Sequence, residues 1–358
     1  MKRKLYYDAS RITALFMITM IHVSAYVVIF FPNVANKEWL VGNIFNGLGR
    51  AGVPLFIMLS GALLLNEDKP CEPKRFYKTH LLPMASLTVL WLVLYGAFYA
   101  FLLPAIKEMP CSFSNFLNYL VSFRGSEYPH LWYMYMVLGL YLMIPVLRLF
   151  VKKENKKYVQ GIIIASIVVQ FFKTTLGLFS SDLALSVVKV IDNLCLQPVT
   201  GYLGYILLGW YLDNFDLKDT NKKILYALGF IALAVSTIAV YYLIDPIPAA
   251  RDYLYSQLSL PPVFFASAIF VLYKAIFDGK ETKNKLAKML SRYSFGIYLI
   301  HVFVLEILVQ LIIPFERFAL QSPLLYIAMI FSAVTIFSYL IVMAFDHMGK
   351  AKKIFYLK

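Results

Sequence analysis

Charged residues are scarce in this chain of 358 residues. Aspartate, glutamate, lysine and arginine together make up 15% of it, while hydrophobic residues make up 60% and the mean hydropathy is +0.69. A soluble domain carries roughly a quarter charged residues. The shortage of charge therefore excludes an ordinary soluble enzyme and predicts an integral membrane protein.

Cysteine is scarce too, with only Cys71, Cys111 and Cys195, which lie far apart in the sequence. A structural zinc site needs closely spaced ligands and a disulfide scaffold needs more cysteines, so we expect neither, and no bound metal or other cofactor. A disulfide between Cys111 and Cys195 is kept as an alternative, because the topology below puts both residues outside. No catalytic Ser/His/Asp order, carboxylate pair or His-x-x-x-His spacing stands out, which leaves little support for a soluble-type hydrolase or a zinc protease.

Long apolar runs take the place of charge along the whole chain. A helix of about 20 apolar residues spans the roughly 30 Å of hydrocarbon in a bilayer. The run at 197–213 is short and rich in glycine. It is counted as a span because a crossing there is needed to keep the basic loops before and after it on the same side of the membrane. We predict an all-α integral membrane protein, a single domain over 1–358 with about ten transmembrane helices at 10–31, 43–65, 81–103, 131–150, 158–178, 197–213, 223–244, 260–278, 291–313 and 323–345.

The basic residues indicate which way the helices run. There are 34 lysines and arginines against 20 acidic residues, for a net charge of +14. With the N-terminus inside, 25 of the basic residues fall in cytoplasmic segments and seven in outer ones. This bias predicts that both termini are cytoplasmic and that the N-terminal apolar run is retained as a helix. The positive charge then fits membrane lipids and gives no reason to expect nucleic acid.

The first apolar run carries three ionisable residues, Asp8, Arg11 and His22. Eleven positions separate Arg11 from His22, which is about three helical turns, so both side chains lie on one face about 16 Å apart along the axis. Ionisable groups inside a bilayer are costly and usually face a cavity or the bundle interior. We expect His22 to belong to a functional site, although a histidine that merely bonds a neighbouring helix is the plain alternative.

Further polar residues lie at comparable depth or at the predicted outer mouth. His301 lies about ten residues into its run, as deep as His22, and Glu306 follows it towards the outside. Arg50 lies among glycines at the outer end of the second run, where snorkelling to the interface is the plain alternative. His130 and Tyr133 lie at the outer mouth, after a loop over 104–130 that suits either a folded cap or a surface segment. We treat these five as candidates for binding an acceptor or stabilising an oxyanion.

Several short motifs occur in a fixed order along the chain. Each of them is weak alone, but together they resemble the membrane-bound acyltransferase 3 family, whose members O-acylate bacterial envelope glycans. The motifs are Asp8-x-x-Arg11 with His22, the run RAGVPLFIMLSGA over 50–62, HLWYMYM over 130–136, the segment from Gly201 to Leu212, and SFGIYLIH over 294–301.

The resemblance implies a ten-helix enzyme of the bacterial cytoplasmic membrane. It would take an acyl group, usually acetyl, from cytoplasmic acetyl-CoA as co-substrate to a hydroxyl of a lipid-linked or polymeric glycan outside. His22 matches the histidine regarded as catalytic, and Asp8 and Arg11 belong to the same motif. The CoA phosphates would meet Arg11 and the basic stretch with Arg75 and Lys78, which holds less arginine than is usual in the family.

A secondary transporter or exporter is the alternative from another class. Buried His22, His301 and Glu306 would suit a proton relay in such a protein. The chain shows no inverted repeat and no paired interrupted helices, which are typical of transporters. The acyltransferase interpretation therefore takes precedence, with His22 acting either as a general base or as the acyl carrier.

Overall fold

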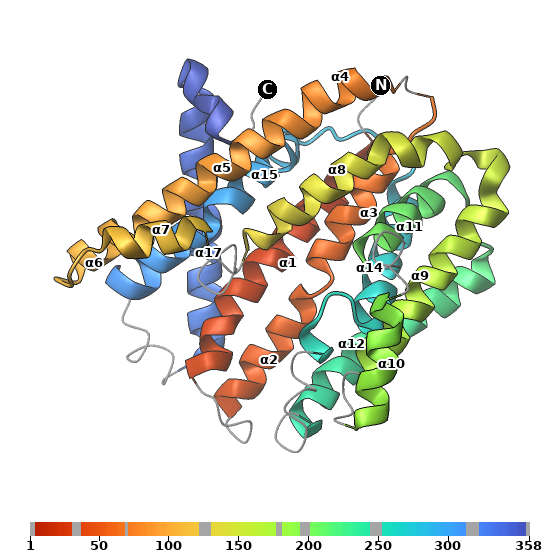
Figure 1. Ribbon diagram of the computed structural model, residues 1–358, viewed down its shortest axis with the longest axis horizontal. Coiled ribbons are helices and arrows are strands. Elements are labelled where there is room, and N and C mark those ends of the chain that lie inside the picture. The colour runs from red at the N-terminus through yellow and green to blue at the C-terminus, as the bar shows by residue number, and fades with distance from the viewer. Residues whose placement is uncertain are drawn as a thin grey trace. The chain divides into compact units, whose positions relative to one another are not determined.

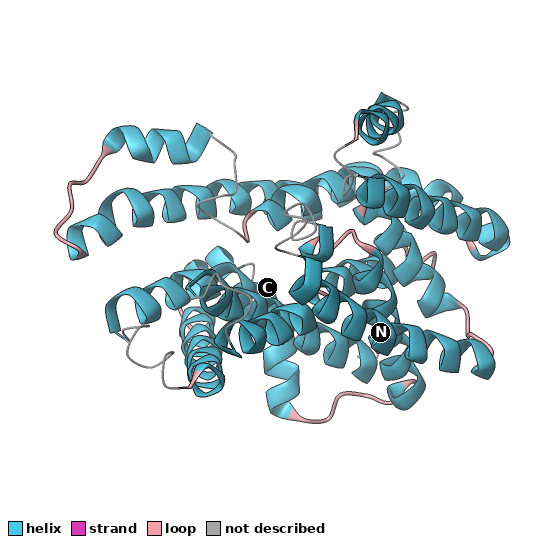
Figure 2. Ribbon diagram, turned by 90° about the horizontal axis from the view of Figure 1, so that it is seen from below, coloured by secondary structure: helices cyan, strands magenta, loops and turns pink. Residues whose placement is uncertain are grey.

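The computed structural model describes residues 4–30, 37–68, 71–121, 130–176, 181–193, 201–243, 253–312 and 322–355. Within these ranges all regular elements are helices, which Figure 2 draws in cyan. Nine helices of the described part are long and apolar enough to cross a membrane. The prediction of an all-α, multi-pass membrane protein is confirmed.

The chain forms two compact units that are discontinuous in sequence. The first consists of Met1–Asn66 and Val151–Ala344, and the second of Glu67–Phe150 and Phe345–Lys358. The second unit is thus inserted after the third helix and also takes up the C-terminal segment.

Helix α1 (Leu5–Phe30) is the central element of the first unit. It is a long apolar helix. Four helices pack against it from several sides and bury apolar residues such as Ala14, Leu15 and Val23. These neighbours, drawn around α1 in Figure 1, are α2 (Lys37–Gly49), α3 (Gly52–Leu64), α14 (Leu260–Phe277) and α15 (Lys285–Ile307), the last extended by the π-helical turn η4 (Leu308–Ile312).

The remaining helices of the first unit pack outside this central group. Helix α11 (Tyr202–Asn214) lies on α3, α9 (Lys156–Leu176) lies on α11, and α12 (Asp219–Leu243) lies on α14. The short turn η3 (Lys153–Asn155) precedes α9, and α10 (Asp182–Asn193) packs beside it. Helix α17 (Pro323–Asp346) brings Phe331 edge to face against Phe16 of α1, with ring centroids 5.8 Å apart.

Several predicted spans begin earlier in the structure, such as 81–103 at Pro73 and 260–278 at Tyr253, and two spans differ in more than their ends. The run at 43–65 begins earlier, at Lys37, and is interrupted at Arg50 and Ala51 between α2 and α3. The run at 197–213 gives only the 13-residue α11, about 20 Å long, which is too short to cross alone. Its first residues, 197–200, lie outside the described part of the chain.

Two glycines let α3 and α11 approach each other closely. A Cβ atom on Gly61 would collide with the carbonyl oxygen of Ile206, and one on Gly209 would collide with the carbonyl oxygen of Met58. Both collisions are with backbone, which cannot move aside as a flexible side chain can. Small residues at such crossings are common between membrane helices.

One long helix forms the centre of the second unit. It runs from Pro73 to Ile106 through α4 (Pro73–Phe76), η1 (Tyr77–Leu81), α5 (Leu82–Ala97), η2 (Phe98–Leu102) and α6 (Leu103–Ile106). Helix α8 (Trp132–Phe150) packs against it, and the C-terminal turn η5 (Gly349–Phe355) is held by Trp91, whose Nε1 donates a hydrogen bond to the Ile354 carbonyl at 2.9 Å.

The loop predicted over 104–130 is partly helical. Helix α7 (Phe113–Val121) folds back along α5 and η2, with the Phe116 ring 5.5 Å from that of Phe101. Residues 122–129 lie outside the described part. So does Cys195, and the Cys111–Cys195 bridge therefore stays a prediction.

Candidate functional site

Two histidines from α1 and α15 meet in the interior of the first unit. The ring centroids of His22 and His301 are 5.1 Å apart and the ring planes make an angle of 54°. His22 follows Leu5, the first residue of α1, by 17 positions, and His301 follows Lys285, the first residue of α15, by 16. Because the two helices pack together, these nearly equal spacings bring the two rings to a similar level.

His301 is held in one tautomer by the backbone of its own helix. Its side chain is completely buried, and Nδ1 lies 2.6 Å from the carbonyl oxygen of Tyr298. A carbonyl can only accept, so Nδ1 carries the hydrogen. In the neutral ring the lone pair is then on Nε2, which is the atom able to accept a proton.

Arg50 brings a fixed positive charge to the histidine pair. Its Nε donates to Oδ1 of Asn46 at 2.9 Å, and Nη2 donates to the same atom. Its Nη1 donates to the Tyr255 carbonyl oxygen at 2.6 Å, and the guanidinium carbon lies 4.5 Å from the centroid of the Tyr255 ring. Its charge is close enough to interact with His22.

Asn46 connects this arginine to the backbone around His22. Its Nδ2 donates to the Ile21 carbonyl and to Ser24 Oγ, both at 3.2 Å. The side chain is buried, so all of these bonds are shielded from water. One amide therefore fixes Arg50 with its oxygen and the turn of α1 that carries His22 with its nitrogen.

The break between α2 and α3 lies directly against α1. A Cβ atom on Gly49 would come within 2.6 Å of the Met17 carbonyl oxygen. Thirteen residues of α2 precede the break, so Arg50 lies deep in its span. The prediction that Arg50 lies at the outer end of the second helix was wrong, because that helix begins at Lys37 in spite of its two charged first residues.

Glu306 lies about one turn beyond His301 along α15. Its Oε1 accepts a hydrogen bond from the Tyr26 hydroxyl at 2.5 Å, and its Oε2 accepts one from Gln310 Nε2 at 2.9 Å. Tyr26 itself lies one turn beyond His22 on α1. The carboxylate group is nearly buried, with 9% of the residue exposed. Acidic and phenolic groups therefore continue from the histidine pair in the direction in which both helices run.

Asp8 and Arg11 lie at the other end of α1. Buried Asp8 accepts hydrogen bonds from Ser291 Oγ and Thr282 Oγ1, both at 2.5 Å, and Arg11 Nη1 donates to Ser291 Oγ at 3.4 Å. Asp8 is about 21 Å and Arg11 about 16 Å from His22 along the helix. Their contacts hold α1 on the start of α15, and their catalytic roles stay predictions.

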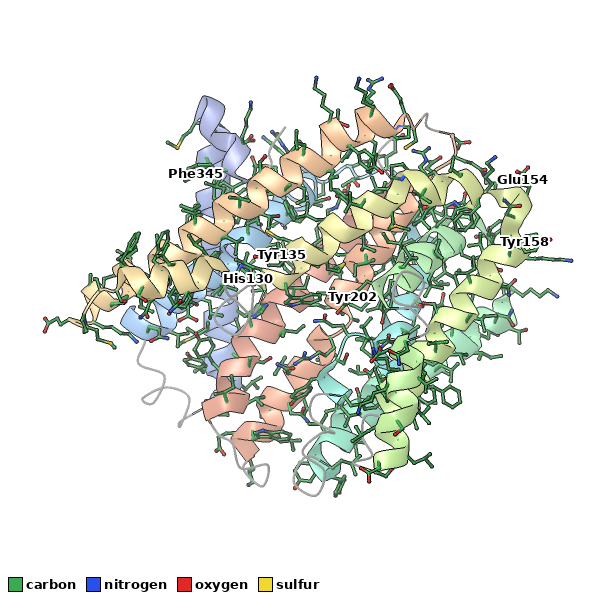
Figure 3. The ribbon with its side chains drawn as sticks, in the orientation of Figure 1. His130, Tyr135, Glu154, Tyr158, Tyr202 and Phe345 are labelled. Atoms are coloured by element: carbon green, nitrogen blue, oxygen red, sulfur yellow. The ribbon has the colours of Figure 1, made fainter. Side chains whose placement is uncertain are left out.

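The other predicted site residues belong to the second unit. Arg75 in α4 and Lys78 in η1 are exposed. His130, labelled in Figure 3, is buried just before α8, with its ring 4.8 Å from that of Tyr95. Tyr133 is buried in the first turn of α8. His22, His301 and Arg50 therefore lie together in the first unit. Arg75, Lys78, His130 and Tyr133 belong to the second unit.

The sequence analysis missed Asn46, Tyr255 and Tyr26. Asn46 and Tyr26 each lie four positions from a predicted site residue, Arg50 and His22 respectively, so the i, i+4 spacing was a usable signal. Tyr255 acts largely through its backbone carbonyl, which no side-chain pattern indicates. Among the described residues no group of three His, Cys, Asp or Glu side chains is placed to hold a metal ion.

A comparison with protein families found one match. The family model, described as an acyltransferase domain, matches residues 4–343 and so covers both units apart from the C-terminal segment. No curated protein and no solved structure matches the chain.

Proposed function

The chain belongs to the acyltransferase 3 family, and we propose that this membrane acyltransferase moves an acetyl group from cytoplasmic acetyl-CoA to a hydroxyl of an envelope glycan. The acceptor is a lipid-linked or polymeric glycan on the outer side of the bacterial cytoplasmic membrane. The observation that carries the proposal is the close pair of His22 and buried His301, with Arg50 fixed beside it.

His22 acts as the general base in the simplest form of this reaction. The neutral imidazole takes the proton of the acceptor hydroxyl while the hydroxyl oxygen attacks the thioester carbonyl. The new C–O bond forms, the C–S bond breaks, and the thiolate of CoA leaves with the proton from His22. In the two-step form His22 carries the acetyl group itself before passing it to the acceptor.

Arg50 is our candidate for stabilising the oxyanion that develops on the thioester carbonyl. A donor helps most when it is already oriented and need not reorganise during the reaction. The bonds from Arg50 to Asn46 and to the Tyr255 carbonyl, together with the Tyr255 ring beneath it, supply that order. Neutral His301 offers a second polar group beside His22.

The phosphates of the donor would bind at the basic, predicted cytoplasmic side. Arg11 lies at the start of α1, and exposed Arg75 and Lys78 add positive charge in the second unit. Basic surfaces attract anionic nucleotides over several ångströms. The roughly 16 Å between Arg11 and His22 suits the reach of a pantetheine arm lying along α1.

Glu306 and Tyr26 would contact the acceptor. A carboxylate accepts several hydrogen bonds, so it binds a neutral, hydroxyl-rich group well and disfavours an anionic one. Replacing Glu306 with Gln should raise the KM for a neutral glycan about tenfold or more and leave the KM for acetyl-CoA unchanged, since a charged acceptor contributes about 1.5–3 kcal/mol. An unchanged acceptor KM would remove Glu306 from this role.

Vesicles with separated donor and acceptor test the transfer across the membrane. Protein is reconstituted, labelled acetyl-CoA is supplied on the side of the basic loops, and a panel of envelope glycans is supplied on the opposite side. Label should reach a glycan on the opposite side. Transfer only when donor and acceptor share one compartment would contradict the proposal.

A further inference from the structure

An apolar cavity of about 340 Å³ opens on the first unit between α9, α11, α12 and α14. Its lining is mainly aliphatic, and several lining residues, including Ile164, Ile224 and Leu228, are also open to the outside. Binding pockets for small molecules have volumes of about 300–1,000 Å³. In a membrane-spanning part of a protein, an open apolar cavity of this size faces lipid chains rather than water.

The cavity has a polar end. Gln160 and Asn221 lie in the first turns of α9 and α12, whereas the more distant lining residues Ile167 and Phe264 are apolar. Glu154 and Tyr158 mark this end of α9 in Figure 3. The cavity therefore has the polarity of a lipid, with a polar group at one end and hydrocarbon at the other.

A second cavity of about 200 Å³ adjoins the first, because Leu212 and Leu217 line both. Its charged lining residues are Lys222, Lys274, Asp216 and Asp278, with Phe215 beside them. Unlike the first cavity, it lies among charged side chains, so the two together form a continuous amphipathic surface.

The basic groups at this end outnumber the acidic ones. The Lys156 ammonium lies 4.2 Å from the centroid of the ring of Phe215, a residue that lines the second cavity, so Lys156 lies beside that cavity. Asp216 pairs with Lys274 at 2.8 Å and Asp219 pairs with Lys222 at 3.0 Å. Segments 152–157 and 216–223, taken together with the lining residues Lys274 and Asp278, nevertheless hold eight lysines and four carboxylates. An anionic group therefore complements this end.

We propose that these two cavities bind one anionic phospholipid of the leaflet that faces the basic loops. One acyl chain lies in the cavity between α9 and α12, and the phosphate lies near Lys156 and Lys222. The lipid covers the short helix α11, which by itself is too short to span the hydrocarbon. This site is separate from the proposed transfer of acetyl groups and does not depend on it.

Native mass spectrometry tests the site directly. Protein is extracted from membranes of equal parts phosphatidylglycerol and phosphatidylcholine, and the lipids that stay bound are identified. Wild type should retain one phosphatidylglycerol. Retention should fall roughly thirtyfold in Lys156→Gln/Lys222→Gln, because each of the two lysines near a lipid phosphate contributes about 1 kcal/mol to binding. It should fall as far in Ile164→Trp/Leu228→Trp, in which indole rings fill the cavity.

Matched controls separate the site from general effects. Ile231→Trp adds an indole to an exposed position of α12 that does not line the cavity, and Lys189→Gln removes a lysine from α10. Both should keep the lipid. Added phosphatidylglycerol should raise the unfolding temperature of wild type and of both controls, because a ligand of the folded state stabilises it. It should do so less in the two double variants, which are first checked for folding in phosphatidylcholine.

Three results would overturn the proposal. They are equal retention of the two phospholipids, retention that the cavity-filling variant leaves unchanged, and a lipid-linked sugar as the species bound in the cavity. None of these measurements reads acyl transfer, so the fate of the acyltransferase mechanism does not affect them.

Discussion

The imidazole rings of His22 and His301 lie side by side in the interior of the first unit, with their centroids 5.1 Å apart. The two residues are almost 280 positions apart in sequence and belong to the first and the last of the motifs within the matched region. Arg50 brings a positive charge to the same place, at the break between α2 and α3. The arrangement joins two imidazoles and an oriented cation.

Asn46 should be a positioning residue for Arg50. In Asn46→Ala, Arg50 loses two hydrogen bonds and the turn around His22 loses two more, so we expect the free energy of unfolding to fall by about 1–3 kcal/mol. We expect kcat to fall about 10- to 100-fold with little change in the KM of acetyl-CoA, because oriented donors act mainly in the transition state. Steady-state kinetics at saturating acceptor checks this.

Asn43→Ala is the matched control for Asn46→Ala. Asn43 is also a buried amide on α2, but it donates to the Thr237 carbonyl and accepts from the hydroxyl of Tyr255, at the end of that side chain away from the carbonyl that Arg50 bonds. It should cost comparable stability and retain most of the activity. Equal losses of kcat in the two variants would show that stability alone explains the effect.

Asp8 should hold α1 on α15. Asp8→Ala leaves the buried hydroxyls of Ser291 and Thr282 without their acceptor, so the free energy of unfolding should fall by about 1–3 kcal/mol. Because Arg11 also bonds Ser291, the KM of acetyl-CoA should rise more than kcat falls. Denaturant unfolding and donor titration measure the two effects. A stable Asp8→Ala protein with lost kcat would give Asp8 a direct catalytic role.

The crossing of α3 and α11 should not tolerate a methyl group. Gly61→Ala and Gly209→Ala each place Cβ against a backbone carbonyl, so both should lower the unfolding temperature markedly. Gly139 on α8 and Gly161 on α9 have open space at the Cβ position. Alanine there should be neutral or stabilise by up to about 1 kcal/mol through helix propensity. Similar effects in all four variants would contradict the close packing.

Sequence reasoning predicted the helical fold and the similar depth of His22 and His301, since both depend on counting residues along apolar runs. It misplaced Arg50 because charged Lys37 and Glu38 hid the true start of α2. Asn46 has meaning only through contacts with another helix, which hydropathy does not encode. The two discontinuous units were likewise not predicted, because which helices share an interior depends on packing between distant segments.

The native cysteines test the predicted orientation. Cys111 is exposed after α6, in a loop predicted to be outside, and Cys71 precedes α4 in a basic loop predicted to be cytoplasmic. In a Cys195→Ser background, a membrane-impermeant maleimide added to intact cells should label Cys111. It should label Cys71 only after the membrane is permeabilised. The reverse pattern would invert the topology and, with it, the sides of donor and acceptor.

The central claim is that His22 is needed for the transfer itself. The most direct measurement follows label from acetyl-CoA in purified wild type, His22→Ala and the control His347→Ala, which removes an exposed histidine beyond α17. Loss of a general base lowers rates about 10²- to 10⁴-fold. We predict that loss for His22→Ala, with unchanged folding, and near-normal transfer for His347→Ala. Wild-type transfer by His22→Ala would contradict the account, and proton-coupled transport without acetyl-CoA cleavage would favour the transporter instead.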